Sequence, residues 1–318
     1  MRRLALAYLG FVIVGGYLAH LIAEDHWLTT IALYLPAIGY AGPAALLALA
    51  ALCQRDGRAL LACAIAGGIV AGPLMGLQWA PPAPEPSGAR LRVMAWNVQW
   101  ALSGMAPIQD ALTRWQPDLV VLTEVPEGDA ELKERLAPVF VEWNTFAASD
   151  VFLASRRPMR ETSVEPLPVS FGRAIAGAEM EVDGQTVTLL GTHFAISRRA
   201  YSLEERLRRL PAYAAEAAAA RSAQARTAVD LAARIEGPLI LAGDFNTPPR
   251  GNVYALLTEE LDDAFAVAGR GWGQTFPARQ PVIRIDYVFT RGLTVVDCRV
   301  GGAGGADHRA VIADLALP

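Results

Sequence analysis

The hydrophobic pattern divides this 318-residue chain into two unlike parts. Three apolar runs lie in the first 80 residues, at residues 4–23, 28–53 and 59–79. Each has about 20 residues or more, which is enough for a helix to cross the hydrocarbon core of a bilayer. The pattern therefore predicts three transmembrane helices in residues 1–80. A cleaved export signal would also explain the first run, but two further runs follow at once, which favours an uncleaved anchor.

Charged residues flank these runs unevenly. Arginines lie before the first run and between the second and third, whereas the first loop is acidic: Arg2, Arg3, Arg55 and Arg58 against Glu24 and Asp25. Because positive residues favour the cytoplasmic side, both arginine-bearing segments should face the cytoplasm. We therefore expect a multi-pass protein of the inner cell membrane, with everything after the third run outside the cytoplasm.

From residue 90 onwards the pattern becomes that of a folded domain. Short runs rich in Val, Leu and Ile, bounded by Gly, Pro, Asn or Asp, predict strands at residues 91–95, 119–122, 151–154, 187–190, 239–242, 285–289 and 311–315. An Ala-rich stretch predicts a helix over residues 212–235, ended by Gly237 and Pro238. A Pro-rich connector at residues 81–89 separates the two parts. Interleaved strands and helices predict a layered α/β domain over residues 90–318.

Composition adds limits to this picture. The chain is 53% hydrophobic, and its excess of apolar residues lies in the first part. It has 28 basic and 32 acidic residues, of which four of each lie before residue 90, so the domain keeps an acidic excess of four. It therefore has no overall electrostatic footprint for nucleic acid. Cys298 is the only cysteine beyond the predicted spans, which excludes a disulfide within the domain.

Side chains capable of chemistry recur where predicted strands end. Asn97 follows the first strand, Glu124 the second, His193 the fourth, and Asp244 and Asn246 the fifth. Glu124 is placed to hold a hard divalent cation such as Mg²⁺. Asp244 can orient a water molecule while Asn246 holds a phosphoryl oxygen, since alternation would aim both the same way. Taken singly, each has a structural explanation, such as a solvated strand edge or an Asx turn.

The domain contains only two histidines, and both lie in such motifs. A pairing of His193 with Asp286 is plausible, because a carboxylate on one imidazole nitrogen fixes the tautomer and stabilises the protonated ring. His308 follows Asp307 and a glycine-rich stretch at residues 301–305 that would let the backbone approach the site closely. His308 could act as a general base or contact the attacked phosphate.

Together these motifs resemble the endonuclease/exonuclease/phosphatase superfamily of metal-dependent phosphoesterases, over residues 90–318. The resemblance implies a four-layer α/β sandwich with two central mixed sheets. It implies Mg²⁺, with Mn²⁺ or Ca²⁺ as alternatives, held by Asn97, Glu124 and Asp307. The implied catalytic residues are His193, Asp244, Asn246, Asp286 and His308, and the implied contacts to substrate phosphate are Asn97, Asn246 and Arg173.

Three positions depart from the pattern of the superfamily. Thr123 replaces the common Gln before the metal-binding Glu, and Ala306 replaces the common Ser before Asp-His. Both positions adjoin a proposed metal-binding or catalytic residue, so we expect these replacements to change the level of activity and not to abolish it. Leu241 stands where inositol-polyphosphate 5-phosphatases carry Trp, which argues against that branch.

Location must guide the choice of substrate, because the fold does not fix it. A membrane tether raises the effective concentration of membrane-borne substrates, which favours a lipid headgroup phosphodiester or another small phosphoester. Five arginines in residues 197–210 could contact anionic headgroups, follow a nucleic-acid backbone, or lie on a solvated helix. The alternatives are an extracytoplasmic nuclease acting on DNA or RNA and a non-catalytic membrane scaffold. No obligate protein partner is indicated.

Overall fold

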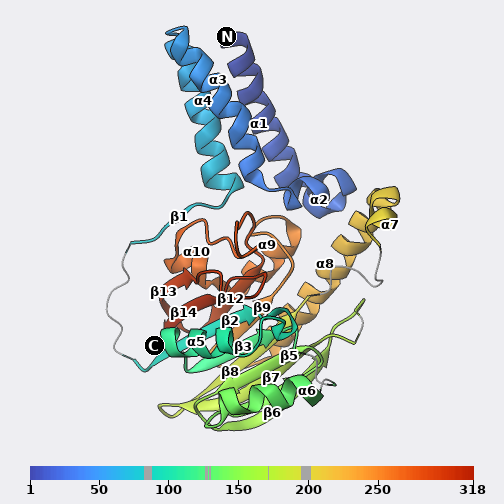
Figure 1. Cartoon of the computed structure of the whole chain (residues 1–318), viewed down its shortest axis with the longest axis vertical. Helices are drawn as coiled ribbons and strands as arrows, with labels where there is room; N and C mark the ends of the chain where they lie inside the picture. The colour runs from blue at the N-terminus through green and yellow to red at the C-terminus, as the bar shows by residue number, and fades with distance from the viewer. Residues whose placement is uncertain (82–87, 126–127, 129, 171, 195–201) are drawn as a thin grey trace.

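The computed structural model describes residues 1–81, 88–125, 128, 130–170, 172–194 and 202–318. A group of N-terminal helices stands on one end of an α/β domain (Figure 1). The helical segment, residues 1–80, contains α1 (Arg2–Ile22), η1 (Ala23–Asp25), α2 (Trp27–Tyr34), η2 (Ala37–Tyr40), α3 (Ala41–Cys53), α4 (Gly57–Ile69) and the π-helical turn η3 (Val70–Leu74). The predicted connector lies mostly outside the described residues.

The N-terminal segment differs from three straight spans. Within the described residues, two helices are long and apolar enough to cross a membrane, Arg2–Asp25 and Gly57–Leu74. The middle apolar run bends by 89° between α2 and the helix that follows it, so it is a third span only if the bent pair counts as one. Pro36 lies at the break, where its missing N–H and its ring interrupt a continuous helix. Helix α2 consequently lies across the base of the bundle (Figure 1).

The chain start and the α3–α4 turn lie at the same end of the bundle, far from the α/β domain (Figure 1). Arg2 forms an ion pair with Asp56 there, with a distance of 3.4 Å between nitrogen and oxygen. The four arginines used to predict orientation therefore gather at one end of the helices, which is the arrangement that the prediction requires.

Two six-stranded sheets form the centre of the domain. The first sheet has the order β13-β14-β2-β3-β5-β4 and the second has the order β10-β12-β9-β8-β7-β6. Their bounds are β2 (Arg90–Asn97), β3 (Leu119–Thr123), β4 (Asn144–Ala148), β5 (Val151–Ser155), β6 (Met159–Pro166), β7 (Ala174–Val182), β8 (Gln185–His193), β9 (Leu239–Asp244), β10 (Asp262–Asp263), β12 (Asp286–Arg291), β13 (Thr294–Val300) and β14 (Val311–Ala316). Each sheet contains one parallel pair, β2–β3 or β8–β9, among antiparallel ones, so both are mixed as predicted.

Alternation along the strands builds the layers. Val93 and Ala95 of β2 point into the core between the sheets, whereas Met94 packs outward beneath α5 (Ala106–Trp115) and α6 (Ala130–Leu136). On the other sheet, Leu241 packs outward against α8 (Leu210–Arg234) and α9 (Asn252–Thr258). Because a strand presents successive side chains to opposite faces, each sheet is covered on both sides. The result is the predicted four-layer sandwich.

Two glycines allow the strands to meet closely beside the site. A Cβ at Gly191 would lie 2.6 Å from a methyl carbon of Leu153 on the opposite sheet. Gly243 has φ +140°, and a Cβ there would lie 1.9 Å from the Thr192 carbonyl oxygen. Only glycine fits these positions without displacing its neighbours. The parallel strands β8 and β9 therefore end side by side.

Candidate active site

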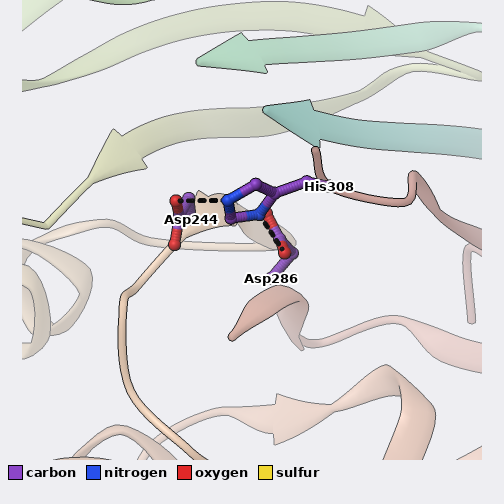
Figure 2. A group of neighbouring side chains, drawn as sticks. All are labelled: Asp244, Asp286 and His308. Atoms are coloured by element: carbon purple, nitrogen blue, oxygen red, sulfur yellow. Dashed lines mark hydrogen bonds and ion pairs between the residues drawn. The ribbon is translucent and has the colours of Figure 1, made fainter. Parts of the chain in front are cut away.

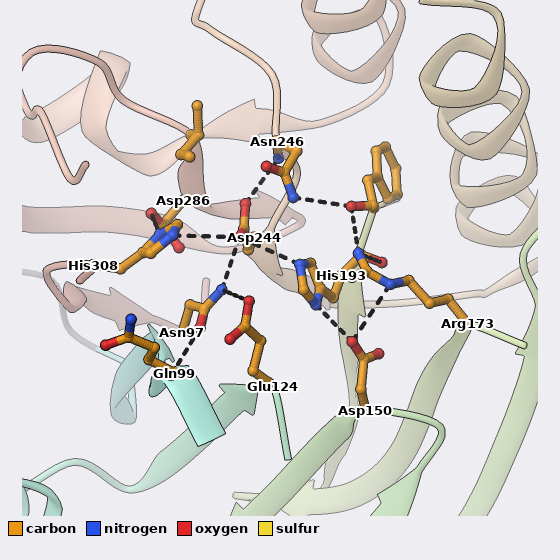
Figure 3. A network of polar contacts seen from close by, with 12 residues as sticks. Asn97, Gln99, Glu124, Asp150, Arg173, His193, Asp244, Asn246, Asp286 and His308 are labelled. Carbon is orange, nitrogen blue, oxygen red and sulfur yellow. Dashed lines mark hydrogen bonds and ion pairs between the residues drawn. The ribbon is translucent and has the colours of Figure 1, made fainter. Parts of the chain in front are cut away.

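The polar side chains gather where strands of both sheets end. Asn97 is the last residue of β2, His193 of β8 and Asp244 of β9. His193 and Asp244 are direct register partners, and Asp286, the first residue of antiparallel β12, is the partner of Asp244 on its other side. Glu124 follows β3 directly. Residues far apart in sequence thus meet at one end of the sandwich (Figure 3).

Asp244 is the centre of this network and is 1% exposed. Its Oδ2 accepts a hydrogen bond from Asn97 Nδ2 at 3.0 Å, and it lies 3.5 Å from His193 Nε2 and 3.9 Å from His308 Nε2. Its Oδ1 accepts the backbone N–H of Asn246 at 2.8 Å. The carboxylate is therefore held in one orientation between an amide and two imidazoles (Figure 3).

His308 forms a buried dyad with Asp286. The imidazole Nδ1 lies 2.8 Å from Asp286 Oδ2, and Nε2 faces Asp244 (Figure 2). Burial by itself lowers the pKa of His308, but the negative charges of Asp286, Asp244 and Asp307 outweigh it and raise this pKa to about 10. The sign of this shift favours the imidazolium at neutral pH, so Nε2 carries a proton toward the site.

The predicted pairing of His193 with Asp286 is wrong. His193 Nδ1 lies 2.7 Å from Asp150 Oδ2, while Asp286 is taken by His308. Burial raises the pKa of Asp150, but the hydrogen bond from His193 and the charges of His193 and Arg173 outweigh it and lower this pKa below its ordinary value. The site thus has two separate imidazole–carboxylate pairs, one on each side of Asp244.

Asp150 is the functional candidate that the sequence prediction missed. It lies in the two-residue turn between β4 and β5, directly before the strand predicted at residues 151–154. The sequence therefore shows that Asp150 lies at a strand boundary. A polar residue at such a boundary is common in turns, so its position alone does not indicate a function. Only the packing of β5 beside β3 in the first sheet, opposite β8, brings it to His193.

We predict that Asp150→Asn lowers kcat about 10- to 100-fold, because a hydrogen bond involving a charged group contributes about 1.5–3 kcal/mol and would be replaced by a weaker one. Steady-state kinetics on the full-length protein would measure this. The control is Asp183→Asn, an exposed turn residue at the opposite end of β8. A wild-type kcat in Asp150→Asn would show that Asp150 has no role in catalysis.

The oxygen atoms at this end of the sheets suit a hard divalent cation. Glu124 Oε1 accepts a hydrogen bond from Asn97 Nδ2 at 3.1 Å, so these two predicted metal ligands lie together, but Asn97 Oδ1, the atom that could bind a metal, accepts the Gln99 backbone N–H at 3.0 Å. The third, Asp307, has a buried Oδ1 with no hydrogen-bond partner in the described part of the chain, as does Asp286 Oδ1. A buried carboxylate oxygen without a partner is costly unless a cation or water satisfies it. The donor set therefore fits a divalent metal.

One group of three has the spacing of a metal site within the described residues. Ligand atoms of Asp244, Asp286 and His308 all lie within 4.8 Å of one another (Figure 2). Both oxygens of Asp244 already accept hydrogen bonds, whereas Asp286 Oδ1 has no hydrogen-bond partner in the described part of the chain, so Asp286 is the member with an oxygen left for a cation or a water.

Asn246 and Arg173 hold the segment after β8 on one side of the site. Asn246 adopts a left-handed backbone with φ 48°, and its Nδ2 donates to the Phe194 carbonyl at 3.0 Å. Arg173 Nη1 donates to the same carbonyl at 2.6 Å, and its Nε lies 3.5 Å from Asp150. Arg173 thus has a structural role beside the site, and its contact with substrate phosphate stays a prediction.

The arginine-rich segment predicted to contact headgroups or nucleic acid is described only in part. Residues 195–201, with Arg198 and Arg199, lie outside the described residues. Helix α7 (Leu203–Arg208) begins with a capping box between Ser202 and Glu205. It lies on the side of the domain nearer the helical bundle (Figure 1).

Comparison with known families agrees with this geometry. The sequence model of the Endonuclease/Exonuclease/phosphatase family matches residues 94–308, which contain every residue of the network described above. The chain belongs to this family. Members of the family are generally phosphoester hydrolases that use a divalent metal. No curated protein sequence matches the chain.

Solved structures confirm the fold of this family member. A D. rerio TDP2 humanized by 14 mutations has 18% identity and a TM-score of 0.57, covering 71% of this chain and 98% of that one. An endonuclease/exonuclease/phosphatase from Beutenbergia cavernae has 22% identity and a TM-score of 0.52, covering 72% of each chain. A family protein from Bacteroides thetaiotaomicron has 13% identity and a TM-score of 0.56, covering 73% of this chain and all of that one. At these identities the likeness concerns the fold alone.

Proposed function

We propose that this protein is a membrane-anchored, Mg²⁺-dependent phosphoesterase that hydrolyses a lipid headgroup phosphodiester or another small phosphoester outside the cytoplasm. The observation that carries this proposal is the convergence of Asp244 with two imidazole–carboxylate pairs and an amide at one end of the sandwich. These groups supply a base for water, proton donors for phosphoryl oxygens, and oxygen ligands for a cation, which are the requirements of phosphate-ester hydrolysis.

Asp244 has the position of the group that orients the attacking water. Its carboxylate is fixed by Asn97 and by the backbone of Asn246, so one oxygen can accept a proton from water without changing its rotamer. The protonated His308 faces the same space and would donate a hydrogen bond to the phosphoryl oxygen, where negative charge grows. Asn246 would contribute its amide on the other side.

Glu124 and Asp307 would hold the cation, and Asn97 would join them through Oδ1 once its amide is reversed, because Nδ2 now faces Glu124. Bound there, Mg²⁺ would neutralise charge on the phosphate and on the leaving oxygen. His193, held by Asp150, faces Asp244 from the side opposite His308 and would keep the water-binding oxygen oriented. These assignments predict that activity depends on added metal and is lost with a chelator.

The placement of the N-terminal segment favours a membrane-borne substrate. A mainly apolar cavity of about 370 Å³ lies between α1, α2 and η3 and reaches Pro249 and Arg250, a few residues beyond Asn246. Such a cavity could receive an acyl chain while the phosphate enters from the membrane side. The candidate spans and the arginines at the far end of the bundle support anchoring with the domain outside the cytoplasm.

A nuclease is the second candidate. One solved structure of similar fold is a D. rerio TDP2 complexed with a single-stranded DNA product, at 18% identity and a TM-score of 0.56. A nuclease would contact several backbone phosphates, so its activity would fall steeply as salt rises.

Competition between substrates tests the proposal. The full-length protein, reconstituted in vesicles with Mg²⁺, would be assayed on anionic and zwitterionic phospholipids, single-stranded DNA and RNA. We expect release of a phosphorylated or free headgroup from lipid, with weak dependence on salt. Turnover of nucleic acid alone, with steep salt dependence, would establish the nuclease instead.

A further inference from the structure

The N-terminal segment contacts several residues of the loop that carries Asn246. This loop, residues 245–252, leaves β9 directly after Asp244 and runs into α9. Its Thr247 is fully buried, and the Thr247 Oγ1 is hydrogen-bonded to the Tyr34 hydroxyl of α2 at 3.2 Å. The loop is therefore packed between the domain and a helix from the other part of the chain.

Arg250 and Asn252 continue this contact. The Arg250 guanidinium donates to the carbonyl oxygens of Leu74 and Leu33. The backbone N–H of Asn252 donates to Glu24 Oε2 at 2.6 Å, at the N-terminus of α9. Both donors would lose their partners if the two parts separated, so these partly buried bonds resist separation.

Tyr34 is itself held from the opposite side. The guanidinium of Arg221 on α8 lies 4.4 Å from the centre of the Tyr34 ring. Further along, Trp272 Nε1 donates to the Ala71 carbonyl at 3.1 Å, and β1 (Gln78–Trp79) pairs with β11 (Arg270–Gly271). The N-terminal segment is thus docked at several points and not only tethered by the connector.

Asn246 directly precedes the docked residue Thr247. Its φ of 48° lies in the sparsely populated left-handed region, and such a conformation persists only where the surroundings determine it. The domain supplies two of the restraints, through Asp244 Oδ1 and the Phe194 carbonyl. The third is the position of Thr247, the next residue: the Tyr287 hydroxyl of the domain donates to its carbonyl at 2.8 Å, and the Tyr34 hydroxyl of the N-terminal segment is bonded to its side chain.

We propose that Tyr34 and Glu24 of the N-terminal segment are positioning residues for Asn246, so that the proposed membrane anchor is also a working part of the active site. The proposal rests on the phosphoesterase function proposed above. It assigns a role to the N-terminal segment beyond attachment: docking of α2 and η1 sets the backbone from which the Asn246 amide reaches the substrate.

The test is a double-mutant cycle in the full-length protein in detergent micelles. Tyr34→Phe removes one hydroxyl and should lower kcat about 3- to 10-fold at unchanged KM, which is the size of one net hydrogen bond. In an Asn246→Ala background the same change should have little further effect, because both act on one interaction. Glu24→Ala should behave in the same way. Additive losses in the two backgrounds would overturn the proposal.

The matched control is Tyr8→Phe. The Tyr8 hydroxyl donates to the Tyr40 carbonyl within the N-terminal segment and not to the loop, so its removal should leave kcat unchanged. A loss equal to that of Tyr34→Phe would indicate general destabilisation and contradict the proposal.

Hydrogen exchange gives a readout that does not need turnover. Tyr34→Phe should speed exchange of the amides at residues 246–252 relative to wild type, while Tyr8→Phe should not. Unchanged exchange in this loop would overturn the positioning role. If wild type lacks phosphoesterase activity, the proposed function fails, while exchange still decides whether Tyr34 holds the loop.

Discussion

Asp244→Asn should lower kcat by about 100- to 10,000-fold, the range that a positioned general base contributes. The substitution keeps the shape of the side chain but removes the charge that accepts a proton from water. It also places an NH₂ group among donors, since Asn97 Nδ2 and two imidazoles already face this carboxylate. Steady-state kinetics at saturating Mg²⁺ and circular dichroism would measure activity and folding.

The control for this variant is Asp262→Asn. Asp262 is exposed on the edge strand β10 and pairs in register with Thr290, at the end of β12 remote from Asp286. It should retain full activity. A folded Asp244→Asn protein with wild-type kcat would show that another group activates the water.

His308→Gln should cost about 100- to 1000-fold in kcat, because one strong donor to the phosphoryl oxygens is lost from a buried site. Asp286→Asn should cause a loss of similar size, since Asp286 keeps His308 protonated and oriented.

The double variant should be no worse than the more damaged single one, because the two side chains act as one unit. If the loss in the double variant equals the product of the two single losses, Asp286 acts separately from His308, for example as a metal ligand. Wild-type activity in His308→Gln would show that the His308–Asp286 pair takes no part in catalysis.

The layers of this fold could be predicted because every central strand except β7 carries its own signal. All seven predicted strands are present, and the predicted helix over residues 212–235 matches α8 within two residues. The strands missed in these two sheets are β4, β6, β10 and β13 at the edges and β7 inside the second sheet. Strand β6 is mostly exposed and polar, so its pairing with β7 produces no hydrophobic alternation that a reader of the sequence could detect.

Most side chains that converge at the site could be picked out from the sequence, but Asp150 and the pairing of carboxylates with imidazoles could not. Asn97, Glu124, His193 and Asp244 are marked by their place at strand ends, which local pattern reveals. Which carboxylate faces which imidazole depends on strand order, and the order β12-β9-β8 sends Asp286 and His193 to opposite sides of Asp244. The same limit applies to Tyr34, whose contact with Thr247 joins residues 213 positions apart.

The second apolar run shows a related limit. Residues 28–53 are long and apolar enough for one membrane span, but length and apolar composition do not reveal that the helix bends. The 89° break follows from Pro36 together with contacts that hold α2 on the α/β domain. Tertiary packing here outweighs the hydrophobic pattern.

The measurement that tests the central claim most directly is hydrolysis of bis(p-nitrophenyl) phosphate by the full-length protein, with Mg²⁺, with chelator, and with Asp244→Asn as the blank. Metal-dependent turnover that falls to the blank in Asp244→Asn is the expected result. Turnover that persists unchanged in Asp244→Asn, or none from a folded wild type at any metal concentration on this ester or on the lipid and nucleic-acid substrates, would contradict the assignment of this site as a phosphoesterase centre.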